Sequence, residues 1–184
     1  MNAALPPPEL LARVIGELQA LIGARNDPVF AEDAVEASEV RRFIHATMDD
    51  PARYADGTVP LGFPVHMFRR GLTEPDPLDA VADKDFDGRS QVLTGRDFEG
   101  VARVLRPGLP AVEVPLTRLL NGGYEYLFYR RARIGERVYR ISSYHDFALR
   151  QGSTGPNILV RVDDAYFTAD DAPLLNAIAT VILR

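Results

Sequence analysis

Apolar residues follow a helical spacing in the first quarter of this 184-residue chain. Positions three and four apart predict an amphipathic helix over residues 9–22, which begins after a run of prolines and ends at Gly23. We expect its apolar side to pack on the domain or on a partner subunit, because it carries few cations for a membrane surface. A short strand is predicted over 29–36, followed by a helix that Ser38 caps and that ends near residue 47.

The last third of the chain changes to the alternation of β-structure. The odd-numbered positions of the second strand, from Tyr139 to Leu149, form one mostly apolar face. Strands joined by short turns predict an antiparallel meander and an α+β architecture, in which a curved sheet packs on a helix or a second subunit. The predicted strands cover residues 124–131, 138–149, 158–168 and 175–183.

Residues 57–115 show no sustained alternation, and only 98–105 have a helical pattern. An irregular segment of this length in a compact domain is typically functional or covered by a partner. The chain length favours a single domain. We therefore divide it into an N-terminal helical extension, residues 1–27, and one α+β domain, residues 28–184.

The composition excludes several classes of function. The formal net charge is −5, and no Lys-rich block offers the basic face that nonspecific nucleic-acid binding needs. The chain has no cysteine, no apolar run of about 20 residues and no signal-peptide pattern, so we expect a cytoplasmic protein outside the membrane. It has no phosphate-binding or dinucleotide-binding motif, and its three histidines are too scattered for a metal site. We predict neither a metal nor a cofactor.

Three short segments are candidates for a functional site. The stretch ATMDDPARY places two aspartates at the end of a helix, although Asp-Asp-Pro is also common turn chemistry. His66 lies among apolar residues and could line a pocket, whereas His145 is expected in a core or interface. Asn121, Gly122 and Gly123 predict a turn with positive φ, or a close approach of the backbone to a ligand.

Taken together, three segments resemble the MaoC-like hydratase/dehydratase family, in particular its N-terminal-type hot-dog domain. They are VEASEVRRFIHATMDDPARYADG, GFPVHMF and LLNGGYEYLFYRRARIGERV. The resemblance implies a hot-dog fold over about residues 28–184, apart from 74–115, where we find no correspondence. It also implies an acyl thioester of CoA or of an acyl-carrier protein as the substrate. Phe63, Asn121, Gly122 and Gly123, with Arg130 and Arg131, are the residues expected to bind it.

The same resemblance places Asp49 on the catalytic aspartate of the family and Tyr54 on its catalytic histidine. Hydration of an enoyl thioester needs a base to activate water and an acid to protonate Cα. A tyrosine of ordinary pKa, about 10, stays protonated at neutral pH and cannot act as that base. Half of the catalytic pair is therefore missing, and we expect Tyr54 to be non-catalytic.

Members of this type commonly resemble non-catalytic halves that pair with a catalytic MaoC-type subunit. The resemblance thus implies an R-specific enoyl-CoA hydratase or 3-hydroxyacyl-thioester dehydratase, active as a hetero-oligomer in fatty-acid or steroid side-chain metabolism. Two alternatives remain open. The chain could be a self-sufficient homodimeric hydratase that uses Asp49 with His66, or an acyl-CoA-binding module without chemistry.

Overall fold

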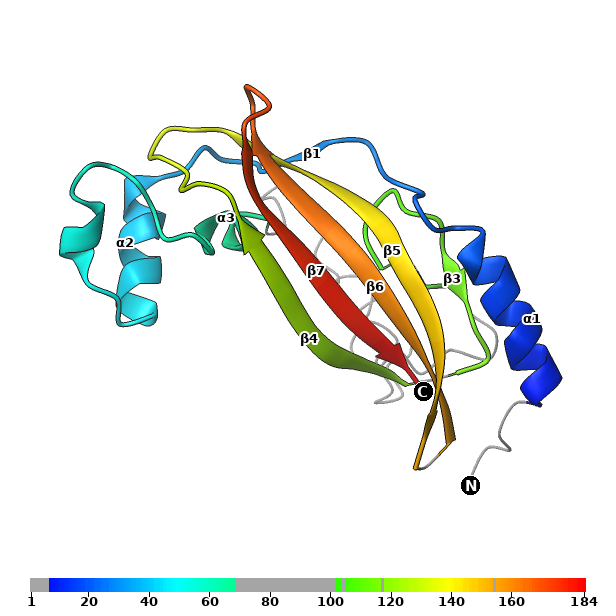
Figure 1. Ribbon diagram of the computed structural model, residues 1–184. Helices are drawn as coiled ribbons and strands as arrows, with labels where there is room; N and C mark the ends of the chain where they lie inside the picture. Colours follow the sequence, from blue (N-terminus) through cyan, green and yellow to red (C-terminus); the bar gives the residue numbers. More distant parts are fainter. Residues whose placement is uncertain (1–6, 69–101, 104, 117, 154) are drawn as a thin grey trace, which may run out of the picture.

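The computed structural model describes residues 7–68, 102–103, 105–116, 118–153 and 155–184 of the chain (Figure 1). The helices of the described residues lie between residues 8 and 66, and long strands make up the last third of the chain. The elements are α1 (Pro8–Gln19), β1 (Val29–Phe30), α2 (Ala37–Ala46), the 3-10 helix η1 (Pro51–Tyr54), α3 (Phe63–His66), β2 (Ala102–Arg103), β3 (Val112–Glu113), β4 (Leu119–Phe128), β5 (Val138–Gly152), β6 (Gly155–Thr168) and β7 (Pro173–Leu183). No helix in the described ranges is long and apolar enough to cross a membrane.

The main sheet has five antiparallel strands in the order β1-β5-β6-β7-β4. The predicted meander is confirmed for β5, β6 and β7, which follow one another through short turns. It is wrong for β4, which pairs with β7, the last strand of the chain, and not with β5. Strand β4 is therefore an edge strand that lies beside β7 in Figure 1.

Strand β5 contains a bulge that changes which residues face the core. Tyr144 pairs with Val162 and Asp146 with Arg161, so His145 has no partner in the ladder. The buried positions are Val138, Tyr139, Ser142 and Tyr144 before the bulge and Phe147 after it. The predicted face of odd-numbered residues is therefore wrong for Ile141 and Ser143, which are only partly buried, although Tyr139 is buried. His145 is exposed, so its predicted place in a core is wrong, and a place in an interface stays a prediction.

The N-terminal elements are shorter than their sequence patterns predict. Helix α1 ends at Gln19 and is followed by a turn. Gly23, at the end of this turn, has φ 83° and donates its N–H to the Tyr144 carbonyl. Strand β1 has two residues instead of eight. Helix α2 begins at Ala37, so Ser38 lies in the first turn and does not cap it. Of the helix predicted at 98–105, residues 98–101 and 104 lie outside the described ranges, and Ala102–Arg103 form strand β2.

Two apolar clusters hold the helices to opposite ends of the sheet, as the positions of α1 and α2 in Figure 1 show. The first contains Leu11, Val14 and Leu18 of α1, which pack with residues of β5, β6 and the 105–116 segment. The second contains Val40 and Ile44 of α2 with residues from β5, β6 and β7. The helical stripes that the sequence shows are thus the buried sides of α1 and α2.

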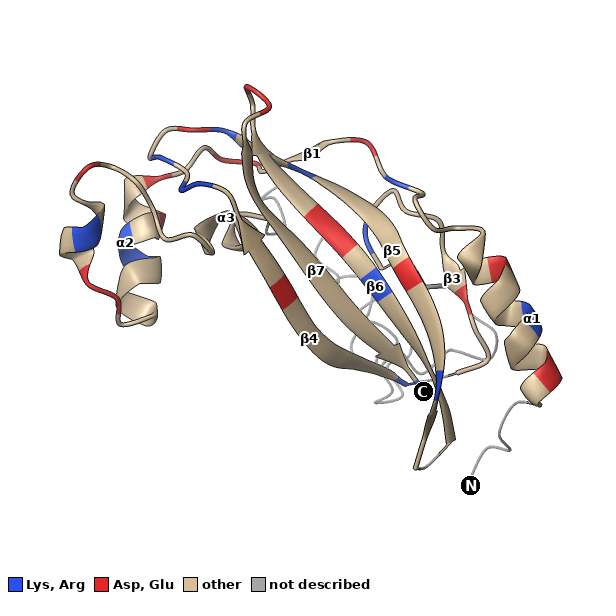
Figure 2. Ribbon diagram, viewed as in Figure 1, with Lys and Arg blue, Asp and Glu red and all other residues tan. Residues whose placement is uncertain are grey.

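A buried carboxylate lies on the core side of β6 between residues of these two clusters. Asp164 is 2% exposed and accepts two hydrogen bonds from Arg106, at 3.0 Å from Nε and 2.8 Å from Nη2. Ser142, its neighbour on β5, donates a third from 2.6 Å. Burial of a charge is tolerated only with such pairing, so Asp164 fixes the 105–116 segment against the sheet. Figure 2 shows the charged positions in the middle of β6.

Removal of this carboxylate is expected to destabilise the fold strongly. Asp164→Ala leaves Arg106 without its buried partner, a change that costs about 3–5 kcal/mol in comparable buried pairs. The adjacent Asp163 faces the other side of β6 and bonds to Asn176, so Asp163→Ala is the matched control and should cost about 1 kcal/mol or less. Urea unfolding monitored by circular dichroism measures both changes. Equal losses for the two variants would contradict the proposed role of Asp164.

Candidate functional site

The loop that carries the candidate residues begins where α2 stops. Met48 takes the left-handed conformation, with φ 54°, and its N–H donates to the His45 carbonyl. The N–H of the next residue, Asp49, donates a hydrogen bond to the Ile44 carbonyl at 3.0 Å. This is the Schellman arrangement, which normally has glycine at the left-handed position. The helix end therefore sets the direction in which the Asp49 backbone leaves α2.

Asp50 and Pro51 then start the short helix η1. The Asp50 carboxylate accepts the Ala52 N–H at 3.0 Å, and Pro51 occupies the first turn, where its missing N–H costs nothing. Asp50 is thus a helix cap. This local chemistry places Tyr54, the last residue of η1, back over Asp49.

Asp49 and Tyr54 are in direct contact. The Tyr54 hydroxyl donates a short hydrogen bond to one oxygen of the Asp49 carboxylate. The other oxygen accepts the Asp50 N–H at 2.8 Å and Arg53 Nη1 at 3.1 Å. The two residues that the resemblance places on the family's catalytic pair are therefore bonded to each other.

These hydrogen bonds move the two pKa values apart. The Tyr54 hydroxyl, together with the Asp50 N–H, holds the pKa of Asp49 below its ordinary value. Partial burial, followed by the negative charge of Asp49, raises the pKa of Tyr54 above 10. At neutral pH the pair is a carboxylate and a neutral phenol, and neither group titrates near pH 7, where a general acid or base works best.

Two arginines extend this arrangement. The Arg131 guanidinium lies over the Tyr54 ring, 5.0 Å from its centre, and contacts the Arg53 carbonyl at 3.4 Å. Arg130, by contrast, forms an ion pair with Glu136 at 3.0 Å. The arginine pair predicted to bind substrate is thus divided, because Arg131 joins the Asp49–Tyr54 site and Arg130 braces its own loop.

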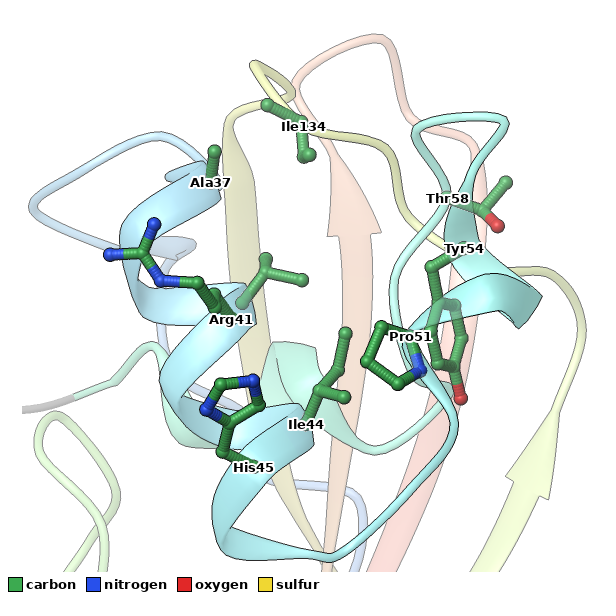
Figure 3. Close-up of a pocket in the computed structure, with 9 residues that line it drawn as sticks. Ala37, Arg41, Ile44, His45, Pro51, Tyr54, Thr58 and Ile134 are labelled. Carbon is green, nitrogen blue, oxygen red and sulfur yellow. The ribbon is translucent and has the colours of Figure 1, made fainter.

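A groove opens between α2 and the loop that carries Tyr54 (Figure 3). Its volume is about 170 Å³. Arg41 and His45 extend from α2 on one side, and the Tyr54 ring lies on the other. The sequence pattern gave His45 no role, because its part in the groove depends on the loop that folds back opposite the helix. The lining residues are Ala37, Val40, Arg41, Ile44, His45, Pro51, Tyr54, Thr58 and Ile134.

The segment Asn121–Gly123 forms a bulge inside β4, not the turn before a strand that the sequence predicts. The Asn121 side chain accepts the Gly123 N–H at 2.8 Å, and Gly123 has a positive φ of 102°, as predicted. A Cβ on Gly122 would come within 2.8 Å of Thr180 Cγ2. The close approach at Gly122 is therefore to β7, and binding of a substrate by these residues stays a prediction.

The structure places His66 and Phe63 against aromatic neighbours. Phe63 is 1% exposed and meets the Phe43 ring edge-on at 5.5 Å, as part of the second apolar cluster. His66 is exposed, with its ring 5.5 Å from that of Phe43. The roles predicted for both in substrate chemistry stay predictions. Within the described residues, no group of three or more metal-binding side chains occurs.

A family model described as "FAS1-like, dehydratase domain region" matches residues 64–177. The chain belongs to this dehydratase family. The match covers α3 and most of the sheet, and begins after Asp49 and Tyr54. No curated protein sequence matches the chain.

A solved structure shows the same fold as this member of the dehydratase family. The ChsH1-ChsH2 complex from Mycobacterium tuberculosis aligns over 94% of this chain and 90% of the matched chain, with 14% identity and a TM-score of 0.60. A C-terminally truncated HadBC (3R-hydroxyacyl-ACP dehydratase) complex from M. tuberculosis is 14% identical, covers 88% of this chain and 98% of the matched chain, and has a TM-score of 0.47. An (R)-hydratase from A. caviae involved in PHA biosynthesis is 15% identical, covers 86% of this chain and 96% of the matched chain, and has a TM-score of 0.44. The predicted hot-dog fold and hot-dog dehydratase family are confirmed.

Replacement of the Tyr54 hydroxyl is expected to raise the pKa of Asp49. A carboxyl whose pKa is lowered by folding contributes stability above its unfolded pKa of about 3.9, and this stability is lost as the pH falls through the folded value. In Tyr54→Phe the largest cause of the lowered pKa is absent, so acid unfolding should begin at higher pH. ¹³C NMR of the Asp49 carboxyl measures the shift. Tyr129→Phe, at an exposed tyrosine after β4, is the control, and an unchanged Asp49 pKa in Tyr54→Phe would contradict the assignment.

Glycine at position 48 is expected to stabilise the protein. Met48 is 92% exposed and holds a left-handed φ, which costs an L-residue about 1–2 kcal/mol. Glycine removes that strain but loses more backbone entropy on folding, so we expect a net gain of roughly 0.5–1 kcal/mol. Thermal unfolding of Met48→Gly measures it. Met48→Ala keeps the strained conformation and should give no gain, so equal stabilisation by both variants would argue against the strain.

Proposed function

We propose that this chain is the non-catalytic hot-dog subunit of a hetero-oligomeric R-specific enoyl-CoA hydratase or 3-hydroxyacyl-thioester dehydratase. The observation that carries the proposal is the hydrogen bond between Asp49 and Tyr54. The substrate is an acyl thioester of CoA or of an acyl-carrier protein, from fatty-acid or steroid side-chain metabolism. A catalytic MaoC-type subunit supplies the acid and base.

The bonded pair is poorly suited to hydration or dehydration on its own. Water must lose a proton as it attacks Cβ of the enoyl thioester, and Cα must gain one. The raised pKa of Tyr54 keeps its proton in place, and the lowered pKa of Asp49 makes its carboxylate a weak base. Both oxygens of that carboxylate already accept hydrogen bonds. These features support a role in shaping the acyl site instead of in proton transfer.

The edge strand β4, which no other described strand covers on its outer side, supports a partner. All ten residues of β4 are exposed, and Glu125 is its single charged residue (Figure 2). Tyr124, Tyr126 and Phe128 stack in a row, with ring centres 5.9 and 5.7 Å apart. A long edge strand with few charges is a site for pairing with another strand. We propose that the partner's sheet covers this edge, an arrangement in keeping with the ChsH1-ChsH2 structure, which is itself a complex.

The row of aromatic rings lies on the core side of the sheet. Tyr124, Tyr126 and Phe128 pair with Ala179, Ala177 and Leu175 of β7, all of them buried. Residues opposite one another in a ladder share a face, so the rings continue the core surface out to the free edge. A second subunit at this edge would bury the rings and join the two cores.

The proposal is tested by measuring whether hydration activity depends on mixing this chain with a catalytic MaoC-type subunit. The lone chain should hydrate a medium-chain trans-2-enoyl-CoA at the background rate. Addition of a MaoC-type subunit that retains the Asp–His pair should raise the rate at least 100-fold above that of the lone chain, because acid–base catalysis contributes about 10²–10⁴-fold. Loss of the enoyl-thioester absorbance measures turnover. Robust hydration by the lone chain, abolished in Asp49→Ala, would refute the non-catalytic role.

A matched pair of surface variants tests the docking edge in the same assay. Leu127→Lys puts a charge on β4 at a side chain that is 58% exposed, so it should prevent association without lowering the melting temperature of the lone chain. Leu149→Lys puts the same charge on β5, far from that edge in the strand order, and should leave association unchanged. Size-exclusion chromatography of the mixtures gives the direct readout. Full association of Leu127→Lys would exclude β4 as the docking edge.

A further inference from the structure

The groove between α2 and the 51–58 loop has an apolar floor. Val40 and Ile44 are 4% and 5% exposed and lie at its base, with Pro51 between Ile44 and the Tyr54 ring in Figure 3. Ile134 and Ala37 close one end. The five α2 residues of the lining are spaced as one helical stripe, so a single face of α2 forms the wall. An apolar surface of this shape suits a short aliphatic chain.

The rim of the groove carries cationic and donor groups. Arg41 and His45 are one helical turn apart on α2, and both are exposed. Within the described residues, no carboxylate lies within ion-pairing distance of Arg41, whereas the next residue, Arg42, is paired with Glu39 at 2.7 Å. A guanidinium with five donors and no ion-pair partner among the described residues is a ready site for a carboxylate.

The aspartates near this rim are engaged elsewhere. Asp49 is bonded to Tyr54 and Arg53, and Asp50 caps η1. Asp56 accepts hydrogen bonds from the backbone N–H and the hydroxyl of Thr58, and Arg133 lowers its pKa further. None of the three lines the groove. The uncompensated charge at the rim is therefore the positive charge of Arg41.

We propose that this groove binds a short aliphatic carboxylate, with the chain on Val40, Ile44 and Pro51 and the carboxylate at Arg41 and His45. The volume of about 170 Å³ sets the length. An engineered apolar cavity of about 150 Å³ accommodates benzene, which has six heavy atoms. A chain of about five or six carbons therefore fills the groove. The groove shares Tyr54 with the candidate site, but carboxylate binding there does not depend on the acyl-thioester role and requires no catalysis.

Methyl NMR of the full-length chain tests the proposal with hexanoate and with hexan-1-ol, which has the same chain length and no charge. Hexanoate should shift the Ile44 and Ile134 methyl signals in a saturable way and leave Ile158, in the cluster around α1, unchanged. Hexan-1-ol should bind roughly fivefold more weakly, the difference that an exposed ion pair of about 1 kcal/mol provides. Equal affinity for the two compounds would overturn the carboxylate assignment.

Three variants locate the site. Arg41→Gln should weaken hexanoate binding roughly fivefold, to the level of the alcohol, while Arg42→Gln, its paired neighbour outside the groove, should not change it. Ala37→Leu keeps a good helix former at an exposed position and fills one end of the groove, so it should abolish binding of both compounds. Unchanged hexanoate binding in Ala37→Leu, or equal effects of the two arginine variants, would refute the site.

Discussion

The buried carboxylate of Asp164 is the constraint on which the arrangement of the sheet and its helices depends. Asp164 and Ser142 are direct partners in the β5–β6 ladder and are bonded to each other. A slip of one residue between these strands would turn Asp164 to the opposite face and leave Arg106 unpaired. It would also move the apolar positions on which α1 and α2 pack. One polar contact thus specifies a register that apolar alternation alone would leave less certain.

The sequence predicted the strands better than their partners. Alternation located β5, β6 and β7 to within a few residues, because each has a buried and a less buried face. It could not show that β4 pairs with β7, since that choice depends on a long-range contact between segments far apart in the chain. The bulge at His145 was also hidden, because one unpaired residue reverses the parity of the faces without altering the composition.

In the candidate site, the sequence could indicate contacts between residues that are close in the chain, but not contacts between residues that are far apart in it. Asp49 and Tyr54 are five residues apart, and Asp50 with Pro51 provides the turn that joins them. Arg131 is far from Tyr54 in the sequence, but its guanidinium lies over the Tyr54 ring. No pattern in the chain predicts this contact. Asn121–Gly123 was predicted as a turn because turns and bulges both need a positive φ, and only the β7 partner distinguishes the two.

The pairing of β4 with the last strand also constrains the order of events during synthesis. The partner of Tyr126 is Ala177, roughly 50 residues later in the chain. At about 5–20 residues per second, β4 leaves the ribosome some 3–10 s before β7 is available to pair with it. During this interval both edges of an aromatic strand are open, and the inner edge closes only when the C-terminal residues arrive. A second subunit can therefore meet a properly paired β4 only after β7 has been synthesised and has paired with it.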